Sequence, residues 1–274
     1  MRPELLFLLI ASPFIGSFLA LVSQRLPLGQ QVLTGRSHCP GCNRSLNLLD
    51  MVPLISALVL KFRCRSCGFA FGTRDSMIEL LSLWLCLWAV LALPWPVVLV
   101  GVPLAWCLLV LAIIDFEHLY LPDLLLLPLT LAGLGFSYWW QPDLFVHHTI
   151  GLLMGGGLFF LIRWLYSRLR GREAMGLGDV KFACAIGAWV GWMGLASVIL
   201  IAAVSALVFY LIRERLRKRS PRLIDKTGSP PEMQAEEELD TEASEERDSS
   251  LLPFGPFLAL GLWIIWLHGP IMVG

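Results

Sequence analysis

Charged side chains are scarce in this chain, because lysine, arginine, aspartate and glutamate make up only 15% of its 274 residues. Hydrophobic residues account for 57%, and the mean hydropathy is +0.71. This balance excludes an ordinary soluble domain, in which about a quarter of the residues are charged. The apolar composition predicts contact with membrane lipid, and with a net charge of zero we expect no nucleic-acid partner. The sequence predicts no particular oligomeric state.

Long apolar runs take the place of charged surface. A helix needs about 20 apolar residues to cross a bilayer core. Candidate spans are residues 5–24, 76–93, 97–114, 124–140, 148–166, 180–212 and 251–270. The first run lacks the basic start and the cleavage site of a secretory signal peptide, so we expect a retained helix. The predicted fold class is an all-α polytopic membrane protein with a small cytoplasmic zinc-binding loop.

Lysine and arginine are absent from many of the connections between these spans. Apart from Arg2, seven lie between Arg25 and Arg74, five between Arg163 and Lys181, and eight between Arg213 and Arg247. The positive-inside rule places these three regions in the cytoplasm and the N-terminus outside. Residues 180–212 must then form two helices that turn near 191–194, because a single 33-residue span is too long for a modest tilt. We therefore expect eight spans.

The spans divide the chain into five parts. These are a first transmembrane helix (1–24), a cytoplasmic loop (25–75), transmembrane helices 2 to 7 (76–212), a charged cytoplasmic linker (213–250) and a final transmembrane helix (251–274). The linker has almost no large apolar residues and carries a run of acids after a run of bases, so we expect disorder. The glycines at 155–157 favour close helix packing over phosphate binding, since no strand precedes them.

Four cysteines form a metal-binding pattern in the cytoplasmic loop. Cys39 and Cys42 stand in "HCPGC", and Cys64 and Cys67 stand in "FRCRSCG", with 21 residues between the two pairs. This spacing is typical of a tetrahedral zinc site. Two disulfides are the alternative, which a reducing cytoplasm disfavours. Four thiolates leave no open position for water, so we expect the zinc to be structural and to organise the loop.

Two acidic residues stand out, because ionisable groups at membrane depth are costly and usually functional. Asp115 ends a span in "LLVLAIIDFEHLYLPD" and Asp179 begins one in "MGLGDVKF", and the predicted topology puts both at cytoplasmic ends. Facing each other, the two carboxylates can share one proton and activate water for peptide hydrolysis, as in aspartic proteases. The alternative is that each acid only caps its helix.

Three charged neighbours of these acids have simpler interpretations. Lys181 either favours ionisation of Asp179 or extends to the lipid headgroups. Asp123, which follows Pro122, fits a helix cap at the start of the next span. We expect Glu117 to be an interfacial loop residue.

The motifs follow one another over nearly the whole chain. Their order is "GSFLALVSQRLP", "CPGC", "CRSC", "IDFEHLYLPD", "GREAMGLGDVKF", "GAWVG" and "PFGPFLALG". In this order the chain resembles the type IV prepilin peptidase family, the leader peptidases and N-methyltransferases of bacterial pilus and type II secretion systems. The resemblance implies that Asp115 and Asp179 are the catalytic pair. It also implies prepilin or pseudopilin substrates, cut at the cytoplasmic face of the inner membrane after a glycine that ends a short basic leader.

The resemblance implies a second activity, in which the new amino group is methylated from S-adenosylmethionine. The residues alone do not indicate it, because no glycine-rich strand-to-helix fingerprint for a cofactor is present. In the segment "RDSMIE", Arg74 and Glu79 match the family's motif, and we expect Glu79 to take part in methyl transfer. Two other functions stay open on the residues: a proton-coupled transporter, and a scaffold whose zinc loop binds a partner.

Overall fold

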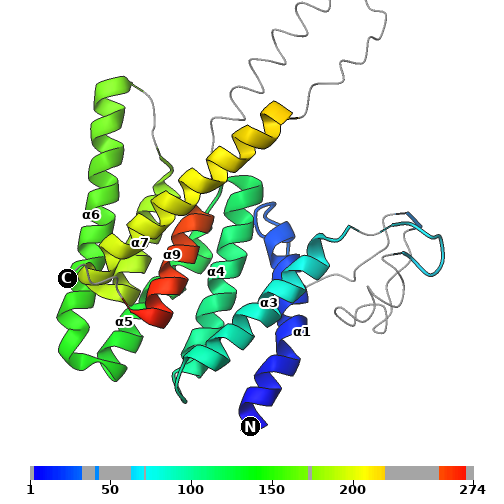
Figure 1. Cartoon of the computed structure of the whole chain (residues 1–274). Coiled ribbons are helices and arrows are strands. Elements are labelled where there is room, and N and C mark those ends of the chain that lie inside the picture. Colours follow the sequence, from blue (N-terminus) through cyan, green and yellow to red (C-terminus); the bar gives the residue numbers. More distant parts are fainter. Residues whose placement is uncertain are drawn as a thin grey trace, which may run out of the picture.

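The computed structural model describes residues 3–32, 41–42, 63–70, 72–171, 175–219 and 253–269. The helices are α1 (Pro3–Arg25), α3 (Arg74–Ala92), α4 (Val98–His118), α5 (Asp123–Trp140), the 3-10 helix η2 (Pro142–Leu144), α6 (Phe145–Arg170), α7 (Leu177–Arg219) and α9 (Gly255–His268) (Figure 1). The described residues contain no strand, only a single bridge between Arg63 and Ala70. The predicted all-α fold class is therefore confirmed.

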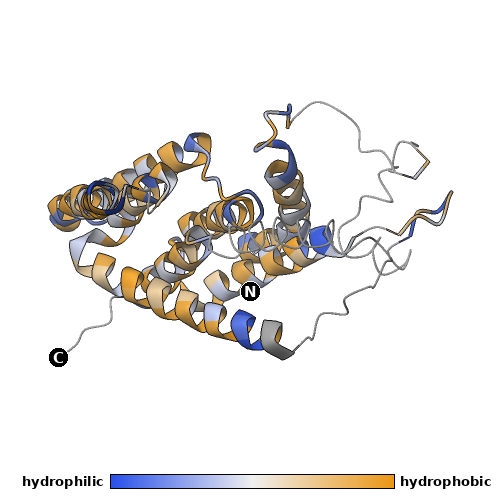
Figure 2. Cartoon of the chain, turned by 90° about the horizontal axis from the view of Figure 1, so that it is seen from above, coloured by the Kyte–Doolittle hydropathy of each residue, from blue (hydrophilic) through white to orange (hydrophobic). Residues whose placement is uncertain are grey.

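Five of these helical stretches are long and apolar enough to cross a membrane. They are Pro3–Arg25, Arg74–Ala92, Val98–His118, Pro142–Arg170 and Leu177–Leu216. Figure 2 shows apolar residues along most of the helical surface, with strongly hydrophilic residues gathered mainly at helix ends. The protein is thus a multi-pass membrane protein. The predicted count of eight spans is not confirmed, because α5 and α9 are not among the five and α7 counts as one.

α7 is interrupted where the sequence predicted a turn. Gly191 has φ 68° and ψ 179°, a non-helical conformation that divides α7 into residues 177–190 and 192–219. The second part returns along α9, since Gly194 lies against Ile265 and Phe209 packs against Phe257 near the start of α9. The predicted pair of helices is therefore present. Its second member includes residues 213–219, which were predicted to belong to the linker.

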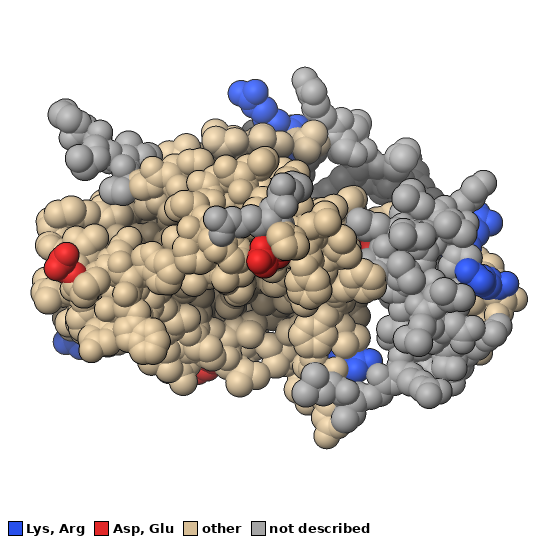
Figure 3. All heavy atoms as spheres, turned by 90° about the horizontal axis from the view of Figure 1, so that it is seen from below, with Lys and Arg blue, Asp and Glu red and all other residues tan. Residues whose placement is uncertain are grey.

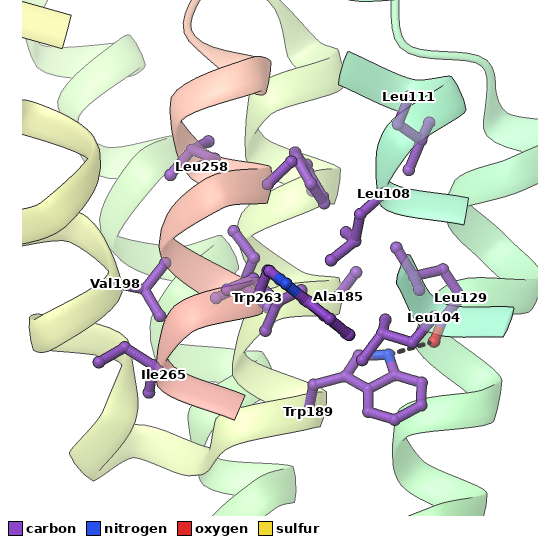
Figure 4. Close-up of a cluster of buried hydrophobic side chains, with 14 of the residues drawn as sticks. Leu104, Leu108, Leu111, Leu129, Ala185, Trp189, Val198, Leu258, Trp263 and Ile265 are labelled. Carbon is purple, nitrogen blue, oxygen red and sulfur yellow. Dashed lines mark hydrogen bonds between the residues drawn. The ribbon is translucent and has the colours of Figure 1, made fainter. Parts of the chain in front are cut away.

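The main apolar core lies where α4, α5, α7 and α9 meet. Figure 4 shows side chains from all four helices pointing into this region, among them Leu108, Leu129, Val198 and Leu258. Trp189 of α7 donates its indole N–H to the Leu129 carbonyl of α5 at 2.9 Å. The bond satisfies a polar group that would otherwise be buried without a partner. It fixes the contact between two helices that both begin beside the candidate active site.

Small residues bring α6 and α7 into close contact. A Cβ added to Gly187 of α7 would lie 2.0 Å from the carbonyl oxygen of Gly151 on α6, and one on Gly155 would lie 2.3 Å from the Ala183 oxygen. Close backbone approach of this kind is typical of small residues spaced four apart in membrane helices. The predicted packing role of the glycines at 155–157 is confirmed for Gly155 and Gly156, whereas Gly157 faces open space.

Candidate active site

Asp115 lies in the last turn of α4 and is buried, with 6% of its surface exposed. Its Oδ2 accepts a hydrogen bond of 2.8 Å from the backbone N–H of Gly255, the first residue of α9. α4 ends just beyond it, where Leu119 adopts a left-handed conformation (φ 51°) and donates its N–H to the Asp115 carbonyl. The carboxylate is therefore held at the junction of α4 and α9.

Asp179 is the third residue of α7 and is partly buried. Its carboxylate accepts a hydrogen bond from the backbone N–H of Gly176, just before the helix. This is the reciprocal contact of a helix capping box, so Asp179 does stabilise the start of α7. The capping contact uses only part of the accepting capacity of a carboxylate, which leaves the acid able to bind a second donor.

The loop before α7 is held from two sides. Arg163 of α6 donates a 2.5 Å hydrogen bond from Nη1 to the Met175 carbonyl. Gly178 packs against the chain that follows α4, because a Cβ at this position would lie 2.9 Å from Cβ of Leu121. The segment carrying Asp179 is thereby fixed against the segment that follows Asp115.

The two acids lie near enough to influence each other although 64 positions separate them in sequence. Asp115 and Asp179 interact electrostatically in the folded chain. Figure 1 shows the C-terminal end of α4 and the N-terminal ends of α7 and α9 at the same, upper end of the bundle. Two neighbouring carboxylates can share one proton and hold a water molecule between them. The arrangement is suited to hydrolysis of a peptide bond, and the catalytic role of the pair stays a prediction.

Lys181 does not pair with Asp179. Its Nζ lies 2.7 Å from both carboxylate oxygens of Asp123, and both side chains are exposed. Asp123 makes no side-chain cap on α5, so the predicted cap is wrong. The ion pair instead joins the starts of α5 and α7 beside the acid pair.

A second polar cluster joins α1, α3 and α4 at the same end of the bundle. Arg74 donates from Nε to Glu117 Oε1 at 2.5 Å and from Nη2 to Oε2 at 2.6 Å. The Nη2 group also donates to the Ser23 hydroxyl at 2.8 Å. Glu117 thus belongs to the last turn of α4 and to an ion pair, not to a loop as predicted. The sequence carried no signal for this partner, which lies 43 positions away.

Glu79 is buried in α3, with 6% of its surface exposed. It faces α1 closely, since a Cβ added to Gly16 would lie 2.7 Å from the Glu79 Cα. One turn away along the two helices, the Ser82 hydroxyl of α3 donates a hydrogen bond to the Ser12 carbonyl of α1 at 2.8 Å. Glu79 therefore belongs to the α1–α3 pair, whereas the aspartates lie on α4 and α7. Its part in methyl transfer stays a prediction.

Three of the four predicted zinc ligands come together in the folded chain. The sulfur atoms of Cys42, Cys64 and Cys67 all lie within 4.8 Å of one another. The turn at Cys64 is closed by its N–H bonding to the Phe69 carbonyl at 2.9 Å. Three convergent thiols fit the donor set of a thiolate zinc site. The fourth predicted ligand, Cys39, lies outside the described residues.

Two protein-family models match successive parts of the chain. The family model described as "Type IV leader peptidase family" matches residues 102–211, which contain both aspartates. The model described as "Bacterial Peptidase A24 N-terminal domain" matches residues 10–93, which contain the cysteines and Glu79. Together the two models cover the two aspartates, Glu79 and the four cysteines that are the candidate site residues.

Several curated relatives align over most of their length. A prepilin leader peptidase/N-methyltransferase of Aeromonas salmonicida is 31% identical, with 94% of this chain and 88% of the relative aligned. Proteins of the same name from Burkholderia pseudomallei (33% identity; 94% and 83%) and Dickeya chrysanthemi (36%; 80% and 86%) match similarly. No solved structure matches significantly.

Proposed function

The chain belongs to the type IV leader peptidase family, and we propose that it is a membrane aspartic endopeptidase that removes the leader from prepilins or pseudopilins. The relatives carry the name prepilin leader peptidase/N-methyltransferase over nearly the same length of chain. The observation that carries the proposal is the electrostatic interaction between Asp115 and Asp179 at one end of the bundle. A transporter site near the bilayer midplane would not need both acids at the ends of their helices.

The proposed reaction is a general acid–base hydrolysis. The ionised aspartate takes a proton from the water held between the two carboxyl groups, and the water oxygen adds to the carbonyl carbon of the scissile bond. The protonated aspartate donates a hydrogen bond to the carbonyl oxygen and stabilises its negative charge. The C–N bond then breaks, and the leaving nitrogen takes the proton that came from the water. The dyad returns to its singly protonated form.

We place the acid pair at the cytoplasmic face of the bacterial inner membrane. The helix ends on the side of the acids carry Arg25, Arg74, Lys181 and Arg213. The connections at the opposite end, residues 93–97 and 141–144, contain no lysine or arginine. Figure 3 shows that opposite end, where most of the described surface belongs to uncharged residues. The positive-inside rule then assigns the acid side to the cytoplasm.

The second proposed activity is N-methylation of the new terminal amine from S-adenosylmethionine. Glu79 is the candidate residue, because a buried carboxylate attracts a cation, and both the methyl donor and the substrate amine are cationic. Zinc is the proposed structural ion, held by Cys42, Cys64 and Cys67 together with Cys39. It would order the loop between α1 and α3, the two helices that pack together at Glu79.

One assay tests the proposal. Purified protein is incubated with a prepilin peptide, with and without S-adenosylmethionine, and the product masses are measured. We expect Asp115→Asn and Asp179→Asn to lose cleavage by at least about 1,000-fold while methylating a pre-cleaved peptide normally. Asp123→Asn is the matched control, an exposed acid near the pair that should keep cleavage. Near-normal cleavage by either of the first two variants would reject the catalytic pair.

A further inference from the structure

The start of α9 has one backbone donor that its own helix does not use. The first N–H groups of a helix lack partners within the helix. In α9, Phe257 and Leu258 donate to the Phe254 carbonyl at 3.2 and 3.1 Å, and Pro256 has no N–H. The remaining donor is the N–H of Gly255, which is directed to Asp115 Oδ2 at 2.8 Å. The first turn of α9 therefore directs one donor at the buried acid.

The Asp115 side chain also fills the space beside Gly255. A Cβ at position 255 would lie 2.6 Å from Oδ2, 2.9 Å from Cγ and 3.1 Å from Cβ of Asp115. Gly255 is not among the glycines with positive φ, so its backbone conformation suits other residues as well. The side chain of Asp115, and not backbone strain, is what excludes a larger residue here.

The contact has an electrostatic consequence. The N-terminus of a helix carries a partial positive charge, and hydrogen bonds from N–H groups to a carboxylate are stronger than those between neutral groups. The Asp179 carboxylate likewise accepts a hydrogen bond from a backbone N–H, that of Gly176 just before α7. Each acid of the pair is thus held by the start of a different helix, and both donors favour the single negative charge that the pair must carry.

We propose that Gly255 is a positioning residue for leader cleavage. The Gly255 N–H fixes the Asp115 carboxyl group and stabilises its charged form. Because Gly255 has no side chain, there is room for the Asp115 carboxyl group beside it. The inference rests on the proposed function of the acid pair. It gives a chemical role to the segment "PFGPFLALG", which in the sequence is recognisable only as part of the family resemblance.

A backbone ester tests the hydrogen bond. Replacing Gly255 by glycolic acid in the full-length protein removes the N–H and keeps the shape of the residue. We expect kcat for cleavage to fall about 10- to 100-fold, and the acidic limb of the pH–rate profile to move to higher pH. Methylation of a pre-cleaved peptide should not change. The same replacement at Gly261, in the middle of α9, is the control and should leave the pH profile as it is.

A thermal double-mutant cycle tests the steric contact without any substrate. We expect Gly255→Ala to lower the midpoint of thermal unfolding, and to do so much less when Asp115→Ala has removed the crowded atoms. Gly261→Ala is the matched control, because its Cβ would lie 2.7 Å from the Val198 oxygen. Its effect should be the same with and without Asp115→Ala.

The two experiments separate failure of this inference from failure of the proposed function. An unchanged pH profile with the ester, or additive effects of Gly255→Ala and Asp115→Ala, would overturn the positioning role even if the acids are catalytic. Normal cleavage by Asp115→Asn would instead overturn the function, whatever the cycle shows.

Discussion

Arg74 and Glu117 form a two-pronged ion pair that joins the first residue of α3 to the last turn of α4, with N–O distances of 2.5 and 2.6 Å. Glu117 stands two positions after Asp115. Because α3 follows the cysteine loop, the pair is a direct link between the part of the chain with the predicted zinc site and the helix that carries one catalytic candidate.

Breaking this ion pair should have a modest effect on stability. Both side chains are 30% exposed, so solvent screens much of the attraction. We expect Arg74→Ala to lower the free energy of unfolding by about 1 kcal/mol, measured by denaturant titration in detergent micelles. Glu117→Gln should have a similar effect, and the double variant should lose less than the sum of the two.

The pair Lys181–Asp123 provides the control for Arg74. Its side chains are 51% and 68% exposed, so Lys181→Met should change stability less than Arg74→Ala does. Additive effects of Arg74→Ala and Glu117→Gln would show that the pair contributes no coupling energy, and that α3 and α4 are held together by apolar packing alone.

The predicted zinc site can be tested by measuring the zinc content of the protein. We expect purified protein to contain about one zinc per chain and Cys64→Ser to lose most of it, as measured by elemental analysis. The loop between α1 and α3 should then be cut faster by a protease, because it is too small to build its own core. Cys86→Ser is the control, since Cys86 is buried in α3 away from the thiol cluster. Full zinc content in Cys64→Ser would contradict the site.

Residue types at fixed spacings point to the acids and to the thiols, and the catalytic and zinc-binding roles of these residues stay predictions. Asp115 and Asp179 interact electrostatically, as expected for two acids at the same end of the bundle. The partners of charged residues could not be predicted in the same way. Lys181 stands beside Asp179 in the chain, but Asp123 is its partner in space, since the lateral packing of α5 against α7 decides which charges meet.

The count of spans shows a second limit of sequence reasoning. Hydropathy identifies apolar stretches, but the ends of helices depend on local backbone conformation. α9 has 14 residues, shorter than the predicted final span of residues 251–274. The break at Gly191 was predictable because charge placement and helix length both required a turn there. The close contact of Gly255 with Asp115 was not, because no pattern in the chain relates positions 140 residues apart.

The contact between α6 and α7 should be highly sensitive to added volume. A Cβ at Gly187 would lie 2.0 Å from the Gly151 oxygen and 2.6 Å from the Leu152 nitrogen. These are backbone atoms, which cannot move aside as a flexible side chain would. We expect Gly187→Ala to lower the free energy of unfolding by about 1–3 kcal/mol or more. Gly157→Ala, on the open side of α6, should change it little, and equal effects would contradict the packing.

The direction of the chain after Gly191 can be tested with topology reporters. The second part of α7 runs back along α9, because Gly194 lies against Ile265 and Phe209 against Phe257. Arg219 should therefore lie on the same side of the membrane as Arg170, and Gln141 on the other side. A fluorescent protein that folds only in the cytoplasm, fused after each residue in turn, should give signal at Arg170 and Arg219 but not at Gln141.

A single continuous span through residues 177–216 would reverse the result at Arg219. The eight basic residues from Arg213 to Arg247 would then lie outside, against the positive-inside rule. α9 would also have to begin on that outer side, which would separate Gly255 from Asp115 by the thickness of the bilayer. The hydrogen bond between them and the acid site beside it therefore both require the chain to turn at Gly191.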